Sequence, residues 1–223
     1  LFCSFVLTPS NASFFIRGHF NLWELGHYYL TLTRRVHHRR YDVHAVLGFI
    51  GLAEKNSTLL KDMDISPNGY FLATVHRPAN TDNPENLIAI FEAFRKLDTT
   101  IIFPVHPRTR GKIADLIENI EFFAPKLKLI EPIGYLDMLS LTKNAKTILT
   151  DSGGLQKEAY WLETPCVTLR EETEWVETVD AGWNTLVGTS KKKILSAVND
   201  WIMPKERPSI YGDGHAAEKI AHT

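Results

Sequence analysis

The chain has 223 residues, of which 44% are hydrophobic and 23% charged, a balance typical of a globular protein with a full core. Its formal net charge of −1 excludes a broad electrostatic footprint for nucleic acid or an anionic membrane, and no apolar run approaches the ~20 residues of a transmembrane helix. Cys3 and Cys166 show no spacing typical of a disulfide framework or a zinc site, so we expect a reducing, cytoplasmic setting.

Residues 1–68 differ in composition from the rest, and we expect an atypical N-terminal segment followed by an interdomain region. Histidines, arginines and aromatic residues are dense in residues 1–45, where no period of 2 or 3.6 is visible. His37 and His38 are adjacent and therefore point to different sides of a helix or strand, which favours a surface turn over a metal site. A first helix is expected within residues 42–60.

A regular alternation of short apolar strands and helices follows over residues 69–208. The strands are expected at residues 70–75, 100–105, 127–130, 146–149, 166–169 and 185–187. The helices are expected at residues 84–97, 109–118, 135–141, 154–162, 173–181 and 191–201. Strands that are apolar throughout are typical of a parallel sheet covered on both faces. The sequence therefore predicts an α/β, Rossmann-like domain with helices on both faces, followed by a C-terminal tail at residues 209–223.

Polar residues follow five of the predicted strands, at the point where each strand ends. They are His76 and Arg77 after the first strand, His106 and Arg108 after the second, Gly134 and Tyr135 after the third, Asp151 to Gly154 after the fourth, and Arg170 to Glu174 after the fifth. The carboxyl ends of parallel strands share one edge of the sheet, and ligands bind there where the strand order reverses. We therefore expect a binding site at this edge.

The strongest single signal is a strand that ends directly before a glycine turn and a helix. Gly153 and Gly154 lack Cβ atoms, so a ligand can approach the main chain, and the free N–H groups of a helix's first turn attract phosphate. Glu158 lies one turn beyond Gly154, where a carboxylate can accept hydrogen bonds from paired sugar hydroxyls. An ordinary helix capped by Asp151 or Ser152 explains the same local pattern, so both interpretations stay open.

Five motifs occur together and in one order. They occupy residues 73–77, 103–108, 150–159, 170–178 and 211–214. Together they resemble the C-terminal half of the non-hydrolysing UDP-N-acetylglucosamine 2-epimerases, over about residues 69–220. Ahead of this region the resemblance thins to short stretches at residues 1–3, 41–43 and 52–55. Residues 4–40 do not resemble the family. Three interpretations stay open for them: a native segment, a segment that has diverged from the family, or a misread sequence.

The resemblance implies two Rossmann-like domains, as in GT-B glycosyltransferases, with the substrate between them and this chain as the second domain. The family converts UDP-GlcNAc to UDP-ManNAc without a cofactor: UDP is eliminated across C1–C2 and then adds back with the proton on the other face. The implied partners are UDP-GlcNAc and UDP, an N-terminal domain that this chain lacks, and a second copy in a homodimer. Since the family's proton-moving carboxylates belong to the N-terminal domain, we expect this chain to bind UDP weakly and not to epimerise.

The resemblance also implies roles for individual residues. Ser152, Gly153 and Gly154 would hold the UDP phosphates, and Glu158 would bind the ribose hydroxyls. His76 matches the functional histidine of the family's His-Arg motif, which protonates the leaving group or steadies its charge. Taken alone, His76 would be interpreted as a structural histidine.

Further candidates for substrate binding are Arg77, His106, Arg108 and Arg170. Arg170 either contacts phosphate or forms a structural ion pair with Glu172 or Glu174. The loop of His106 and Arg108 either contacts the substrate or merely caps the next helix.

Two departures from the family pattern limit what can be transferred. Ala79 stands where many relatives have a glutamate, and Trp175 stands where many bacterial members have an arginine. Trp175 cannot supply that positive charge, although its ring can stack or pack. Asp213 is interpreted as ordinary turn chemistry. A glycosyltransferase half that uses a UDP-sugar donor, and a non-catalytic nucleotide-sugar sensor, remain alternatives.

Overall fold

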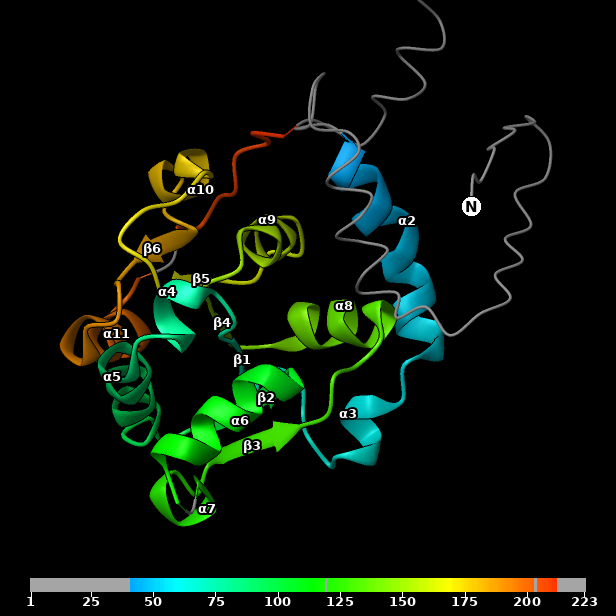
Figure 1. Ribbon diagram of the computed structural model, residues 1–223. Coiled ribbons are helices and arrows are strands. Elements are labelled where there is room, and N and C mark those ends of the chain that lie inside the picture. Colours follow the sequence, from blue (N-terminus) through cyan, green and yellow to red (C-terminus); the bar gives the residue numbers. More distant parts are fainter. Residues whose placement is uncertain (1–40, 119, 203, 212–223) are drawn as a thin grey trace, which may run out of the picture.

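A six-stranded parallel sheet forms the centre of the protein (Figure 1). The computed structural model describes residues 41–118, 120–202 and 204–211, so the predictions about His37, His38 and Asp213 lie outside the described residues. The strands are β1 (Tyr70–Thr74), β2 (Thr100–Pro104), β3 (Leu127–Ile130), β4 (Thr147–Thr150), β5 (Cys166–Thr168) and β6 (Asn184–Leu186). All six predicted strands are present, and no strand end moves by more than one residue.

The strand order is β3-β2-β1-β4-β5-β6, and every neighbouring pair is parallel. The order reverses at β1, which pairs with β2 on one side and with β4 on the other; Leu72, for example, lies opposite Ile102 and Ile148. Every residue of β1 and β4 is buried, as expected for central strands covered on both faces. This is the order of dinucleotide-binding α/β folds, in which ligands bind where the order reverses.

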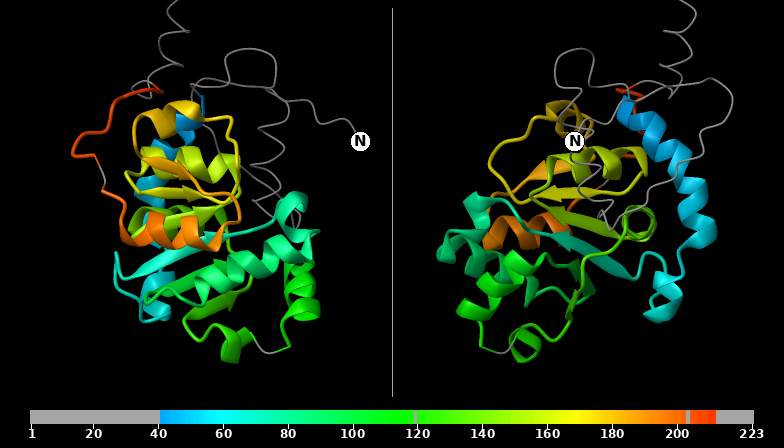
Figure 2. Two further views of the ribbon diagram at one scale, coloured as in Figure 1. Left: turned by 90° about the vertical axis from the view of Figure 1, so that its left-hand side faces the viewer. Right: turned by 45° about the vertical axis from the view of Figure 1, so that its right-hand side comes forward.

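Helices cover both faces of the sheet (Figure 2). One face, which includes Phe71 and Ala73, packs against α5 (Pro84–Phe94), α6 (Pro107–Leu116), α7 (Ile120–Phe123) and α11 (Lys191–Asn199). The other face, which includes Tyr70 and Leu72, packs against α3 (Leu59–Asp62), α8 (Tyr135–Asn144) and α9 (Gly153–Trp161). Because side chains alternate along a strand, β1, β2, β4 and β5 each supply both cores. The predicted α/β class is confirmed.

Helix α2 (Tyr41–Asn56) forms an outer layer on α8 and α9. Val46 and Ala53 are buried in its contact with these helices, while Phe49 is 44% exposed and its ring stands edge-on to the Tyr135 ring, at 6.0 Å between centroids. Among the described residues, no helix is long and apolar enough to cross a membrane.

The segment of residues 204–211 returns to α9 and is held there by aromatic rings. Tyr211 packs edge-on against Tyr160 and Trp161, each at 5.7 Å between centroids. The indole N–H of Trp183 donates a hydrogen bond of 3.3 Å to the carbonyl of Glu206. These contacts bury Tyr211 and fix the segment beside helix α10 (Val176–Asp180) and the loop before it.

Candidate functional site

The ends of β1 and β4 lie side by side at the reversal of strand order. The hydroxyls of Thr74 and Thr150 are 2.6 Å apart, and the Thr150 hydroxyl also accepts a hydrogen bond of 2.9 Å from the main-chain N–H of Ser152. The loops that carry His76 and Gly153 therefore start from one fixed point, as the strand-end pattern predicted.

Asp151 joins these two loops. Its side chain is fully buried and accepts hydrogen bonds from the main-chain N–H groups of His76, at 3.1 Å, and Arg77, at 3.0 Å, and from the amide of Asn80, also at 3.0 Å. The imidazole Nδ1 of His76 lies 3.3 Å from the Asp151 carboxylate. Asp151 thus positions the His-Arg motif instead of capping α9. The cap is Ser152, whose hydroxyl accepts from the Leu155 N–H at 3.5 Å.

Short helix α4 (Pro78–Thr81) follows the His-Arg pair and was not predicted. Asn80, inside α4, donates to the Asp151 carboxylate and to the Leu169 carbonyl and is 4% exposed. Its role escaped the sequence analysis because both acceptors lie more than 70 positions away along the chain. Ala79, where many relatives carry a glutamate, lies in the same helix, and its carbonyl accepts from the Asn86 amide.

The main chain at Gly153 is approached closely by side chains from other loops. A Cβ atom added to Gly153 would lie 3.3 Å from Oε2 of Glu174, 3.4 Å from Nε1 of Trp175 and 3.6 Å from Nη2 of Arg77. Gly154 differs, since a Cβ there would meet only the Ser152 hydroxyl, at 3.9 Å. Of the two glycines, Gly153 is the one that other side chains approach more closely.

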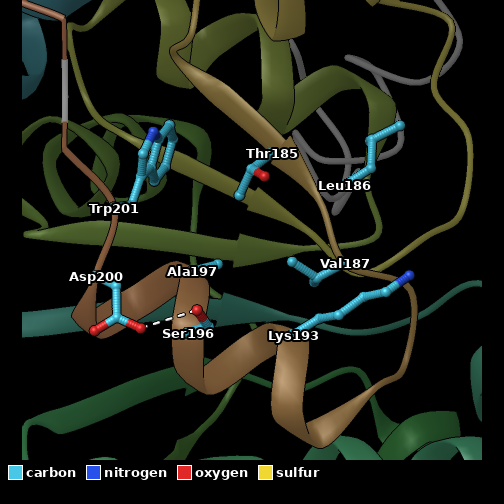
Figure 3. Close-up of a pocket in the computed structure, with 8 residues that line it drawn as sticks. All are labelled: Thr185, Leu186, Val187, Lys193, Ser196, Ala197, Asp200 and Trp201. Atoms are coloured by element: carbon cyan, nitrogen blue, oxygen red, sulfur yellow. Dashed lines mark hydrogen bonds between the residues drawn. The ribbon is translucent and has the colours of Figure 1, made fainter.

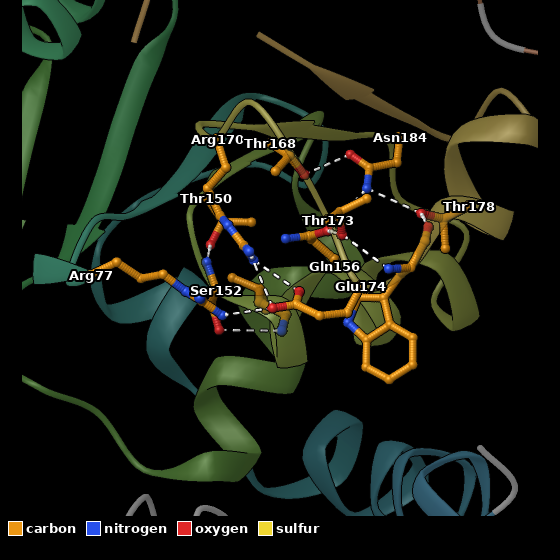
Figure 4. A network of polar contacts seen from close by, with 12 residues as sticks. Arg77, Thr150, Ser152, Gln156, Thr168, Arg170, Thr173, Glu174, Thr178 and Asn184 are labelled. Atoms are coloured by element: carbon orange, nitrogen blue, oxygen red, sulfur yellow. Dashed lines mark hydrogen bonds and ion pairs between the residues drawn. The ribbon is translucent and has the colours of Figure 1, made fainter. Parts of the chain in front are cut away.

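Glu174 joins two arginines above this turn (Figure 4). Its carboxylate accepts two hydrogen bonds from Arg170, at 2.9 and 3.1 Å, and lies 3.4 Å from Nη2 of Arg77. The hydrogen bonds from Arg170, helped by the charge of Arg77, lower the pKa of Glu174 from its ordinary 4.5 to about 2, so the carboxylate is charged at neutral pH. Of the two partners considered for Arg170, Glu174 is the one observed; phosphate contact stays a prediction.

A buried polar network holds the loop of residues 170–175 against α9 and β6 (Figure 4). The side-chain carbonyl of Gln156 accepts hydrogen bonds from the Thr173 hydroxyl, at 2.5 Å, and from the Asn184 amide, at 3.2 Å. Asn184 in turn accepts from the Thr168 hydroxyl at 2.7 Å. The predicted helix at residues 173–181 starts later, at Val176, because the Thr173 hydroxyl accepts from the Trp175 N–H and turns the chain.

Helix α9 carries two further charged side chains near the turn. Glu158, half-buried and one turn beyond Gly154, accepts a hydrogen bond of 3.3 Å from the Tyr135 hydroxyl. Lys157 is 2% exposed, and its amine lies 4.2 Å from the centre of the Trp175 ring and 5.1 Å from that of Trp161. A cation over an aromatic face is attracted by the ring's electrons. The positive charge that Trp175 itself lacks is thus adjacent to its ring.

The loop after β2 lies at the same edge of the sheet, one strand away from β1 on the side opposite β4. His106 is exposed there, and its carbonyl accepts a helical hydrogen bond of 2.9 Å from the Arg110 N–H. Arg108 lies in the first turn of α6. The carbonyl of His106 thus accepts the first helical hydrogen bond of α6. Substrate contact by His106 or Arg108 stays a prediction.

A pocket of about 320 Å³ opens elsewhere, between β6 and α11 (Figure 3). Its lining includes Thr185 and Val187 from the strand side and Lys193 and Trp201 from the helix side, and none of the residues selected from the sequence. We place the candidate site at the reversal of strand order instead, because a glycine turn, two arginines and a histidine converge there. Among the described residues, no group of three or more His, Cys, Asp and Glu could hold a metal ion.

This parallel sheet, with a glycine turn flanked by Arg77 and Arg170 at its reversal point, defines a Rossmann-like α/β domain with a candidate phosphate site. Residues 42–223 match the family model described as UDP-N-acetylglucosamine 2-epimerase. The chain therefore belongs to the UDP-N-acetylglucosamine 2-epimerase family, as the motifs predicted.

Individual relatives agree with this assignment. A UDP-N-acetylglucosamine 2-epimerase homolog from Methanococcus maripaludis is 51% identical over 172 residues, which are 76% of this chain and 48% of the relative. A UDP-2,3-diacetamido-2,3-dideoxy-D-glucuronate 2-epimerase from Pseudomonas aeruginosa is 40% identical over 161 residues, which are 70% of this chain and 44% of the relative. The crystal structure of the Methanocaldococcus jannaschii UDP-GlcNAc 2-epimerase in complex with UDP-GlcNAc and UDP superposes on this chain with a TM-score of 0.71 at 41% identity. The match covers 82% of this chain and 52% of the crystallised one. This chain spans about half the length of these relatives.

Proposed function

We propose that this chain forms the UDP-binding part of an epimerase that interconverts UDP-GlcNAc and UDP-ManNAc. The observation that carries the proposal is the convergence of Arg77, Arg170 and His76 on the glycine turn at the reversal of strand order. Family membership supports it, as does the similar Methanocaldococcus jannaschii structure, which holds UDP-GlcNAc and UDP.

In this proposal the diphosphate binds at the start of α9. The N–H groups of Gly153 and Gly154, the Ser152 hydroxyl and the two arginines Arg77 and Arg170 stabilise it as negative charge develops on departure. The uridine ribose lies further along α9, where Glu158 accepts hydrogen bonds from its hydroxyls. The loop of His106 and Arg108 follows β2 at the same edge of the sheet, one strand further away, and is a further candidate for substrate contact.

The reaction proceeds by elimination and re-addition. A base removes the proton from C2 of the sugar, the C1–O bond breaks with its electrons leaving on UDP, and a C1–C2 double bond forms. UDP then adds back at C1 while C2 receives a proton on the opposite face. His76, whose ring is held against Asp151, protonates the leaving diphosphate or steadies its charge.

The bases that act on C2 are proposed to come from an N-terminal domain across a cleft, as in a GT-B arrangement, and the active assembly to be a homodimer. This chain alone therefore binds UDP without epimerising. Two UDP-sugars are candidates, because the Pseudomonas aeruginosa relative is named for a different one, UDP-2,3-diacetamido-2,3-dideoxy-D-glucuronate. Both carry UDP, and we favour UDP-GlcNAc because most of the similar relatives are named for it.

Thermal unfolding with added nucleotide tests the proposal. Since a ligand that binds only the folded chain raises its stability, the melting temperature should rise with UDP concentration and rise less with uridine. The absence of any rise at millimolar UDP would refute the proposal.

A second experiment incubates UDP-GlcNAc in deuterated water. Deuterium should enter C2 only when a family N-terminal domain is added. Exchange by this chain alone would show that the essential bases are present in it. Release of UDP only with a sugar acceptor would identify a glycosyltransferase instead.

A further inference from the structure

The indole N–H of Trp175 lies at the edge of the glycine turn and is not hydrogen-bonded within the described part of the chain. Its nitrogen is shielded from solvent and has no acceptor among the described residues. It also lies 3.4 Å from the point where a Cβ of Gly153 would stand. Buried N–H groups almost always find an acceptor, so an unsatisfied one at the border of a candidate site needs an explanation. A ligand bound at the glycine turn is a candidate for that acceptor.

The same point is already faced by an anion of the protein. Oε2 of Glu174 lies 3.3 Å from it, and the carboxylate holds both Arg77 and Arg170. Glu174 therefore neutralises the two guanidinium groups that the proposed function assigns to the diphosphate. As long as this carboxylate is there, it competes with a phosphate for Nη2 of Arg77 and for Nη1 and Nη2 of Arg170.

The Glu174 side chain can leave this position without disturbing its surroundings. Its side chain is 51% exposed, whereas that of Arg170 is only 13% exposed, so rotation of Glu174 into solvent would leave the arginine in place. The polar network of Gln156 and Thr173 holds the loop itself and does not include the Glu174 side chain. A diphosphate also brings more charge and more acceptor oxygens than one carboxylate.

We propose that the diphosphate of the nucleotide replaces the Glu174 carboxylate at the glycine turn and takes Arg77, Arg170 and the indole N–H of Trp175 as its donors. Glu174 then competes with the nucleotide from within the chain, and its carboxylate occupies the site when no nucleotide is bound. Trp175, which stands where many bacterial members of the family have an arginine, contributes a directional neutral donor. This inference rests on the proposed function, since it concerns the same UDP site.

Spectroscopy on the unaltered chain tests the exchange directly. The chain has five tryptophans, and the Trp175 indole signal in a nitrogen-15 spectrum is assigned by its loss in Trp175→Phe. UDP should move this signal downfield as the N–H gains a charged acceptor, while uridine, which lacks phosphate, should not. An unmoved Trp175 signal, in a spectrum where other signals report UDP binding, would overturn the proposal.

Calorimetric titration of variants supplies an independent test. Glu174→Gln keeps the shape but removes the competing charge, and UDP should bind it about three- to tenfold more tightly than the wild type. Glu172→Gln is the matched control, because Glu172 is exposed on the same loop, and UDP affinity should be unchanged. Trp175→Phe keeps the ring but removes the donor, and UDP should bind it roughly tenfold more weakly. Uridine affinity should be equal in all four proteins.

The outcomes separate the two proposals. If the wild-type chain does not bind UDP, the proposed function and the exchange both fail. If the wild type binds UDP but Glu174→Gln binds it no more tightly, only the exchange fails and Glu174 is an ordinary structural partner of Arg170.

Discussion

The carboxylate of Asp151 holds His76 twice, through the main chain and through the ring. Each carboxylate oxygen lies 3.1 Å from the His76 main-chain N–H, and Oδ1 lies 3.3 Å from the imidazole Nδ1. The two residues lie in the loops that follow β1 and β4 and are 75 positions apart. The position of the histidine thus depends on the loop that also forms the glycine turn.

Replacement of Asp151 by alanine should destabilise the fold strongly. The change leaves the buried N–H groups of His76 and Arg77 and the amide of Asn80 without their acceptor, and we expect a loss of roughly 2–4 kcal/mol in the free energy of unfolding. Urea denaturation followed by circular dichroism measures it. Asp200→Ala is the control, since the Asp200 carboxylate accepts one exposed hydrogen bond from a serine and its loss should change stability by less than about 0.5 kcal/mol. A similar small value for Asp151→Ala would contradict the role given to this carboxylate.

The ion pairs of Glu174 should make the free energy of unfolding depend on pH between pH 4.5 and pH 2. The pKa of Glu174 is lowered from 4.5 to about 2 by its arginine partners, so its contribution is fully present above pH 4.5 and is lost as the pH falls toward 2. Because the side chain is half exposed, solvent screening keeps the contribution below about 1 kcal/mol. The difference in unfolding free energy between wild type and Glu174→Gln should therefore shrink between pH 4.5 and pH 2. A difference that stays constant over this range would show that the charge contributes nothing.

Substitution of the two glycines should have unequal effects on UDP binding. Gly153→Val brings its side chain against Glu174 and Trp175 and fills the space of the phosphate, so binding should be abolished. Gly154→Ala meets only the Ser152 hydroxyl, at 3.9 Å, and keeps its N–H, so affinity should fall much less. Titration calorimetry compares the two variants. Equal affinities of both variants and the wild type would exclude the glycine turn as the phosphate site.

Cys166 should be inert in the folded protein. Burial raises the pKa of its thiol to about 12, and only the thiolate reacts with disulfide reagents. In a Cys3→Ser background, labelling of Cys166 should therefore follow the urea unfolding curve. Rapid labelling without urea would show that β5 opens locally.

The strand pattern and the location of the site could be predicted from the sequence, because both depend on local order. Six apolar runs mark the strands, and the residues after them, such as His76 and Ser152, necessarily meet at one edge of a parallel sheet. The connections inside the site could not be predicted. Asp151 pairs with His76, and Glu174 pairs with Arg77 across 97 positions, and no periodicity records such long-range partners. Helix α4 was missed because four residues are too few to show a helical period.

The hydroxyl pair of Thr74 and Thr150 has a consequence for how the protein folds. The two residues are 76 positions apart, so the β1–β4 pairing closes a long loop that includes β2, β3 and their helices. Long-range pairings of this kind slow the folding of parallel sheets. During synthesis, β1 and the residues that follow it leave the ribosome before β4 and α9. The site can therefore form only after α9 has been synthesised. Refolding experiments should therefore find nucleotide-binding capacity appearing late, together with the closure of the central sheet.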